Sequence, residues 1–334
     1  MSEKKTVRIN KFDNLKGLAI FLIVLGHMSF LTKYDSISFT HNFAFLFSLA
    51  LFFFVSGYFT RIDENLTIKS IKRLLIPYIL FTIIYWICYL PFGKASQMIF
   101  IYPSYALWFL LALFFMKMAL PIMDRFSYPV LISFIFALLF GFVQYNGDIL
   151  GLRRAFVFFP AFLIGFYFKN NNIELEKCNE ILSPLLNSDI FTIFISVIVL
   201  IVSILVAYFL PLSAIMMKSP LEVPYLFNML IRLLIIVLGI VITLILNRYM
   251  TNQECLLTKW GRNSMAVYLL HIYFIVILKK LTGTFLYQQN ELLCLMFTFI
   301  ASLLIVILLS RDIFTDFINI LSGFFSDLIF KERG

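Results

Sequence analysis

Charged side chains are scarce in this chain of 334 residues: 13% are Asp, Glu, Lys or Arg, whereas 62% are hydrophobic. No polar stretch is long enough to form a separate soluble domain. A soluble fold cannot bury that much apolar surface, so the composition excludes a purely soluble globular protein. It predicts an all-α, polytopic integral membrane protein.

The sequence also lacks the short motifs of nucleotide binding, zinc proteolysis and serine hydrolysis. It contains no P-loop pattern, no G-x-G-x-x-G, no H-E-x-x-H and no G-x-S-x-G. Its few cysteines have neither metal-ligand nor redox spacing, so we expect no metal site. We expect all four to be reduced and structural: Cys88, Cys178, Cys255 and Cys294.

The net charge is +9, but the basic residues lie between apolar runs rather than in one patch. This distribution argues against a nucleic-acid partner and is typical of a protein that sets its orientation in a lipid bilayer. Most of the apolar runs reach about 17–23 residues, the length that a helix needs to cross hydrocarbon. The ten predicted segments are 15–31, 42–59, 74–92, 104–120, 129–146, 152–168, 190–211, 225–247, 263–279 and 292–310.

The charge distribution also predicts the orientation. With the N-terminus in the cytoplasm, nineteen Lys and Arg fall in cytoplasmic segments and seven in outer ones, so both termini are expected inside. The first span has no small-x-small cleavage site after it and is expected to be retained. Residues 1–310 are predicted to form a membrane domain of about ten helices, and 311–334 an amphipathic cytoplasmic tail.

Only three histidines occur, and two of them, His27 and His271, fall inside predicted spans. An ionisable residue within a span is a functional hypothesis by default. Lys16 precedes His27 by eleven residues, or three turns plus about 20°, so the two share one helix face about 16 Å apart. Asp13 lies within one turn of Lys16. The alternatives are a histidine bonded to a neighbouring helix and a snorkelling lysine.

This spacing predicts Lys16 at the cytoplasmic boundary and His27 near the middle of the membrane, where it is the best candidate for a general base. His271 lies nine residues past Arg262, or about 14 Å into its span. The two histidines are therefore expected at similar depth.

Buried or boundary cations mark three further positions. Arg232 lies inside its span, and no acidic residue within another span can pair with it, so it either faces a ligand cavity or snorkels outward. Arg153 and Arg154 open a span on the outer side. Lys72 and Arg73 open one on the inner side, either as membrane anchors or as a site for a polyanion such as a nucleotide pyrophosphate.

Six motifs in order resemble the acyltransferase 3 family of integral membrane acyltransferases, and most of all its fucose 4-O-acetylase-like branch. Lys16 stands where that family usually has Arg, ten residues before the histidine. The resemblance covers residue 8 to about 310. The motifs are FDNLKGLAIFLIVLGH, LFFFVSGYF, KRLLIPY, ALWFLLALF, LRRAFVFFPAFLIGFYFK and WGRNSMAVYLLHIYF.

The resemblance implies an enzyme of the bacterial plasma membrane that transfers an acetyl group from cytoplasmic acetyl-CoA. The acceptor would be a sugar hydroxyl of an envelope polysaccharide or its lipid-linked precursor. No cofactor would be bound permanently, and acetyl-CoA would act as cosubstrate. His27 would deprotonate the sugar or accept the acetyl group itself.

The other expected site residues follow from the same resemblance and from their predicted depth. We expect Lys16 and Asp13 to assist His27, and Lys16, Lys72 and Arg73 to hold the donor phosphates. We expect the acceptor to contact Arg154, Arg232, His271 and Trp108. The alternative function is a transporter or flippase that uses the same buried residues for a lipid-linked or anionic solute.

Overall fold

The computed structural model describes residues 9–31, 35–89, 100–103, 105–140, 149–170, 189–217, 223–282 and 285–330. These ranges contain helices joined by turns and no β-strand. The first half comprises α1 (Asn10–His27), η1 (Met28–Leu31), α2 (Asp35–Phe59), α3 (Leu66–Ser70), η2 (Ile71–Leu75), α4 (Ile76–Tyr89), α5 (Trp108–Met123) and α6 (Pro129–Leu139). The second half comprises η5 (Ile149–Gly151), α7 (Leu152–Asn170), α9 (Asp189–Phe209), α10 (Leu212–Ile215), α11 (Tyr225–Tyr249), α12 (Leu256–Arg262), α13 (Ser264–Thr282), α14 (Phe285–Gln288), α15 (Glu291–Leu309) and α16 (Asp312–Ile329).

The all-α membrane architecture predicted from composition is confirmed. Among the described residues, seven helices are long and apolar enough to cross a bilayer. All ten predicted apolar segments coincide with helices, but three fall short of those criteria. Helix α1 carries three charged residues in its first two turns, and α5 and α6 have only 16 and 11 residues. The orientation of the chain stays a prediction.

The third predicted span begins earlier than the apolar pattern suggested. Its helix runs from Leu66 to Cys88 rather than from about residue 74. It passes through η2, a π-helical stretch of five residues, before it continues as α4. Lys72 and Arg73 therefore lie on the helix itself, where the π-turn shifts their directions relative to a regular α-helix.

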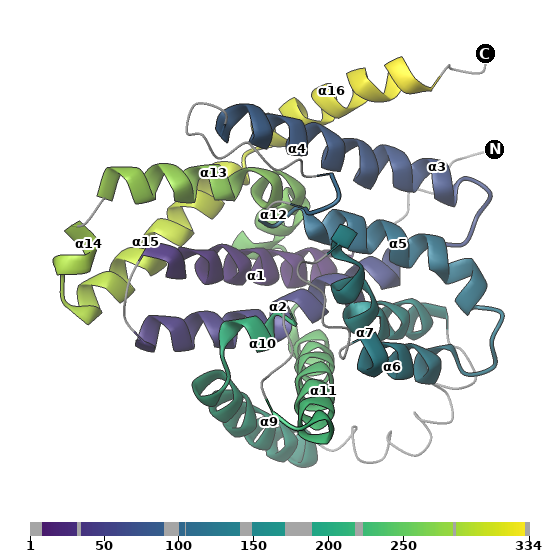
Figure 1. The fold of residues 1–334 in the computed structure, drawn as a ribbon, viewed down its shortest axis with the longest axis horizontal. Coiled ribbons are helices and arrows are strands. Elements are labelled where there is room, and N and C mark those ends of the chain that lie inside the picture. Colours follow the sequence, from purple (N-terminus) through teal and green to yellow (C-terminus); the bar gives the residue numbers. More distant parts are fainter. Residues whose placement is uncertain are drawn as a thin grey trace.

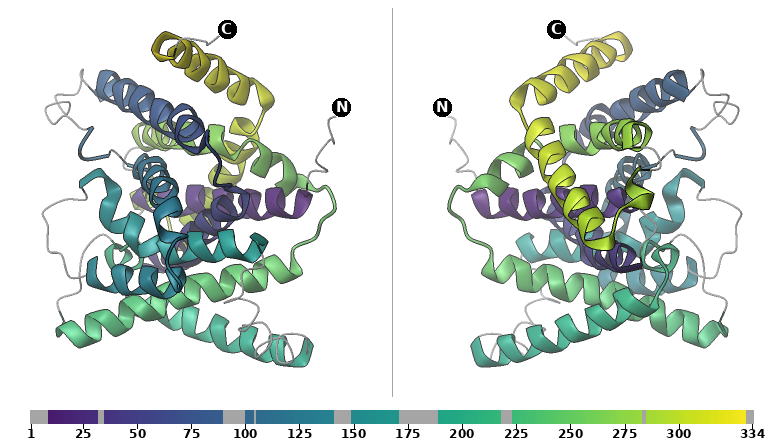
Figure 2. Two further views of the ribbon diagram at one scale, coloured as in Figure 1. Left: turned by 90° about the vertical axis from the view of Figure 1, so that its right-hand side faces the viewer. Right: turned by 90° about the vertical axis from the view of Figure 1, so that its left-hand side faces the viewer.

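Helices α1 and α2 form the centre of the molecule. Helix α1 packs against α2, α12, α13 and α15, while α2 also packs against α7, α9 and α11. Figure 1 shows α16 along one edge of the molecule and α9 along the opposite edge, and both views of Figure 2 place α1 between them. Polar groups on α1 are thus enclosed by protein rather than by lipid.

The crossing of α2 and α7 depends on two glycines. A Cβ atom added to Gly57 would collide with the carbonyl oxygen of Phe162, and one added to Gly165 would collide with that of Phe54. The two backbones approach this closely only because neither position carries a side chain.

Replacing Gly57 by alanine is expected to destabilise the protein, although alanine is the better helix former. The added methyl group meets backbone, which cannot move aside, so the cost should be about 1–3 kcal/mol. Thermal unfolding in detergent measures it, with Gly323→Ala as the matched control because nothing lies within 4 Å of a Cβ at Gly323 in α16. Equal stability of both variants would disprove the close approach.

Helix α16 occupies much of the predicted amphipathic tail. Its inner face includes the buried Ile318 and packs against α4, η2 and α13. Its outer face exposes a separate apolar stripe that includes Phe317 and Phe324. The assignment of this segment as an amphipathic cytoplasmic tail stays a prediction.

Candidate functional site

Two histidines from opposite ends of the sequence lie against each other in the interior. His27 ends α1, and His271 lies in the second turn of α13. Their ring centroids are 5.2 Å apart and the rings are tilted by only 19°, so they stack. Both side chains are buried. The expectation that these residues meet at one depth is confirmed.

The hydrogen bonds of His271 select its tautomer. Its Nδ1 atom lies 3.0 Å from the carbonyl oxygen of Val267 and 2.8 Å from that of Tyr268. Carbonyl oxygens can only accept, so Nδ1 carries the hydrogen and the neutral ring presents a lone pair at Nε2. That Nε2 is buried and has no hydrogen-bond partner among the described residues. An oriented imidazole nitrogen with an unpartnered lone pair can accept a hydrogen bond or a proton from a group placed beside it.

A cavity of about 150 Å³ lies near this pair, although neither histidine is among the residues that line it. Lys16, Ser56 and Ser264 line its polar end. One or two helical turns further along the same helices, Ile23, Phe52 and Tyr268 line its apolar end. The ring of Tyr268 lies 6.2 Å from that of His271, which places the histidine pair just beyond the apolar end.

The cavity is small compared with pockets for drug-sized ligands, which occupy about 300–1,000 Å³. Lys16 and Ile23 line the cavity from α1, and His27 follows about one turn after Ile23 on the same helix.

Lys16 is held in place by the acidic residue predicted to lie near it. Its ammonium is 2.9 Å from a carboxylate oxygen of Asp13, whose other oxygen lies 3.8 Å from Nε of Arg262. Asp13 is buried, whereas Lys16 remains partly exposed. The carboxylate thus orients a cation that is still accessible from the cavity.

Asn14 is a structural residue of the site that the sequence patterns did not single out. It is fully buried, and its side-chain nitrogen donates to the carbonyl oxygens of Thr251 and Gln253 at 2.9 and 3.0 Å. Its side-chain oxygen accepts from the hydroxyl of Thr258 at 2.5 Å. This amide joins α1 to the segment before α13, and so positions Lys16 relative to His271. The sequence signal that could have identified it is its position between Asp13 and Lys16, as a third polar residue in the first turns of an apolar helix.

Two of the residues predicted to bind the acceptor lie together. The guanidinium of Arg154 lies 3.7 Å from the centre of the Trp108 ring. Arg232 is also buried, with Nε donating to Asn228 at 3.0 Å and a weaker contact to the sulfur of Met217 at 3.8 Å. The hydroxyl of Tyr268, whose ring neighbours that of His271, donates to the carbonyl oxygen of Ala106, two residues before Trp108.

The two inner cations predicted to bind the donor have different neighbours. The ammonium of Lys72 lies 5.3 Å from the centre of the Phe330 ring, beyond the end of α16. Arg73 precedes Leu74, which lines the cavity that contains Lys16. The donor-binding roles of Lys72 and Arg73 stay predictions.

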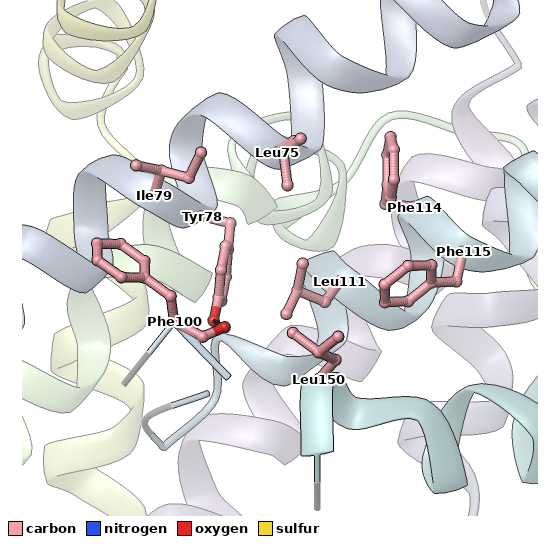
Figure 3. A pocket seen from close by; sticks show the side chains of 8 residues that line it. All are labelled: Leu75, Tyr78, Ile79, Phe100, Leu111, Phe114, Phe115 and Leu150. Carbon is pink, nitrogen blue, oxygen red and sulfur yellow. Dashed lines mark hydrogen bonds between the residues drawn. The ribbon is translucent and has the colours of Figure 1, made fainter. Parts of the chain in front are cut away.

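A larger cavity of about 440 Å³ lies on the other face of η2 and α5. Figure 3 shows its apolar walls, which include Leu75, Leu111, Phe114 and Phe115. Among the described residues of its wall, Tyr78 is the only titratable one, and its hydroxyl donates to the carbonyl oxygen of Phe100 at 2.8 Å.

None of the three described cysteines forms a disulfide with another described residue: Cys88 and Cys255 are exposed, and Cys294 is buried with its thiol donating to the carbonyl oxygen of Leu286 at 3.1 Å. Cys178 lies outside the described residues. No group of three or more His, Cys, Asp or Glu within the described ranges could hold a metal ion.

The fold and the site define a multi-pass membrane protein in which a cavity lined by a lysine lies next to a buried pair of histidines. The family model of the acyltransferase domain (acyltransferase 3) matches residues 9–311, nearly the whole chain. The chain belongs to this family and is a membrane acyltransferase, which favours the enzyme over the transporter alternative. No curated protein and no solved structure matches it.

Proposed function

We propose that the protein is an O-acetyltransferase of the fucose 4-O-acetylase-like branch, in the bacterial plasma membrane. It would transfer an acetyl group from cytoplasmic acetyl-CoA to a sugar hydroxyl of an envelope polysaccharide or its lipid-linked precursor. The observation that carries this proposal is the single cavity with Lys16 at its polar end and the His27–His271 pair beyond its apolar end.

The cavity separates the two halves of the donor according to their chemistry. Phosphates at the polar end are neutralised by Lys16, which Asp13 orients. The uncharged pantetheine arm extends along Ile23 and Phe52 towards Tyr268. This places the thioester close to the histidines, where the low-polarity surroundings strengthen electrostatic interactions.

In the direct route, the acceptor hydroxyl oxygen attacks the acetyl carbonyl carbon while His27 takes the hydroxyl proton. The carbon–sulfur bond breaks, and the proton passes to the departing thiolate, giving the sugar ester and the CoA thiol. In the covalent route, an imidazole nitrogen of His27 attacks the acetyl carbonyl carbon, the carbon–sulfur bond breaks, and the thiolate takes the N–H proton of the ring to leave as the CoA thiol. The sugar hydroxyl then attacks the acetyl carbon, the carbon–nitrogen bond breaks, and the hydroxyl proton returns to the ring. In either route, Nε2 of His271 offers its lone pair as a second acceptor for the proton that is being transferred.

The acceptor would enter beside the outer cations. The stacked Trp108 ring fixes the plane of the Arg154 guanidinium, which can then bind a sugar or phosphate oxygen. In the predicted orientation, Arg232 lies inside its span towards the outer side of the membrane, and it would add a second hydrogen-bond donor for the acceptor.

The function is tested by NMR of surface glycans from cells with and without the protein. O-acetyl signals should appear only with the protein, and membranes should transfer label from acetyl-CoA to the glycan. Identical glycan spectra together with no transfer of label would refute the acetyltransferase.

Replacing Lys16 by alanine is expected to raise the apparent KM for acetyl-CoA about tenfold, because one charge-assisted contact to phosphate is lost. The KM for the sugar should change much less. Lys16→Arg keeps the charge and should stay close to the wild type, as should Lys259→Ala, which removes an exposed lysine from α12. An effect confined to the sugar would separate Lys16 from the donor.

A further inference from the structure

Helix α5 contributes a lysine on the same face that lines the Lys16 cavity. Leu110 and Leu113 line that cavity, and Lys117 follows them by seven and four residues, or within about 20° and 40° around the helix. Figure 3 shows Leu111, Phe114 and Phe115 directed instead into the second, apolar cavity. Lys117 thus extends the face of α5 that lines the Lys16 cavity, one turn beyond its polar end.

A second cation approaches Lys117 from η2. Arg73 directly precedes Leu74, another residue of the cavity wall, and η2 packs against α5. The two positive charges are close enough to repel each other. None of the ion pairs between described residues includes either side chain.

Lys117 is partly buried and Arg73 is exposed. Neighbouring like charges destabilise each other unless an anion offsets them. A phosphate suits a neighbouring lysine and arginine, because it offers several oxygens to their donors. Lys16, at the polar end of the same cavity, adds a third cation. The region therefore suits more than one phosphate group.

We propose that Lys117 and Arg73 form a phosphate-binding pair at the polar end of the cavity, and that Lys117 binds a phosphate of the acetyl-CoA donor. This rests on the proposed function, which takes acetyl-CoA as the donor. A phosphate could also come from a lipid headgroup, so the experiment has to distinguish the two sources. Nothing in the motif resemblance assigns a role to Lys117.

The test is CoA binding by titration calorimetry to the full-length protein in phosphatidylcholine nanodiscs. Lys117→Met should raise the dissociation constant for CoA about tenfold, the expected loss of one charged hydrogen bond. Lys117→Arg should stay within about threefold of the wild type. Lys259→Met, which removes an exposed charge on α12, should bind CoA as the wild type does. Thermal unfolding of each variant confirms that it is folded.

A second measurement separates phosphate binding from damage to the cavity. S-acetylpantetheine carries the thioester and the arm but no phosphate, so Lys117→Met should lower kcat/KM for acetyl-CoA and leave that for S-acetylpantetheine unchanged. Equal losses with both donors would overturn the phosphate role.

Two other outcomes would also overturn it. If Lys117→Met binds CoA as tightly as the wild type, Lys117 is a lipid anchor and the acetyl-CoA donor remains intact. If the wild type itself does not bind CoA, the donor assignment and this inference are both wrong.

Discussion

Replacing His27 by alanine is expected to lower the rate of acetyl transfer by about 10²–10⁴-fold, the usual contribution of a general base. His27 ends α1 and its ring stacks against that of His271 on α13, so contacts from both helices fix the position of the ring. The loss should appear in kcat, measured with labelled acetyl-CoA and membranes that contain matched amounts of protein.

The third histidine provides the control for this variant. His41 lies in α2 and is buried, as His27 is in α1. None of the described ring contacts joins His41 to the histidine pair. His41→Gln should therefore retain activity within a few-fold of the wild type. Full activity of His27→Ala would remove His27 from the reaction.

Replacing His271 by glutamine is the second large effect, a fall in kcat of about 10²-fold or more. Glutamine keeps a polar group near the position of Nε2 but cannot accept a proton at neutral pH. If His271 serves only to bind the acceptor, as its predicted role implies, glutamine should raise the acceptor KM and spare kcat. Separate measurement of kcat and KM therefore decides between proton transfer and acceptor binding.

The stacked rings also predict how the two substitutions combine. Residues that act as one unit are strongly non-additive, because removing either one already disables the step. The double variant His27→Ala/His271→Gln should be about as impaired as the worse single variant. Multiplied losses would show that the two histidines act independently.

Much of this arrangement could be predicted because helical rise converts residue spacing into depth. The eleven residues between Lys16 and His27 predicted one stripe, and counting from Arg262 brought His271 to a similar level. The ion pair between Asp13 and Lys16 follows from the same periodicity. These predictions needed only one helix at a time.

The remaining features depend on which helices are neighbours, and spacing along one helix does not contain that information. The contact of Arg154 with Trp108 joins α7 to α5, and the repulsion between Arg73 and Lys117 joins η2 to α5. Lys72 and Arg73 lie on a π-turn, which leaves no periodic signal in the apolar pattern. Such features become visible only when the helices are packed together.

The hydrogen bonds of Asn14 have a consequence for biosynthesis. Its partners Thr251, Gln253 and Thr258 lie 237–244 residues further along the chain. At about 5–20 residues per second, the ribosome makes them tens of seconds after α1. During that time the polar face of α1 remains in the translocation machinery or against lipid, so the hydrogen bonds of the first helix are complete only when residues up to Thr258 of 334 have been synthesised. Truncated chains that end before residue 250 should therefore be recognised and degraded, although most of their helices are complete.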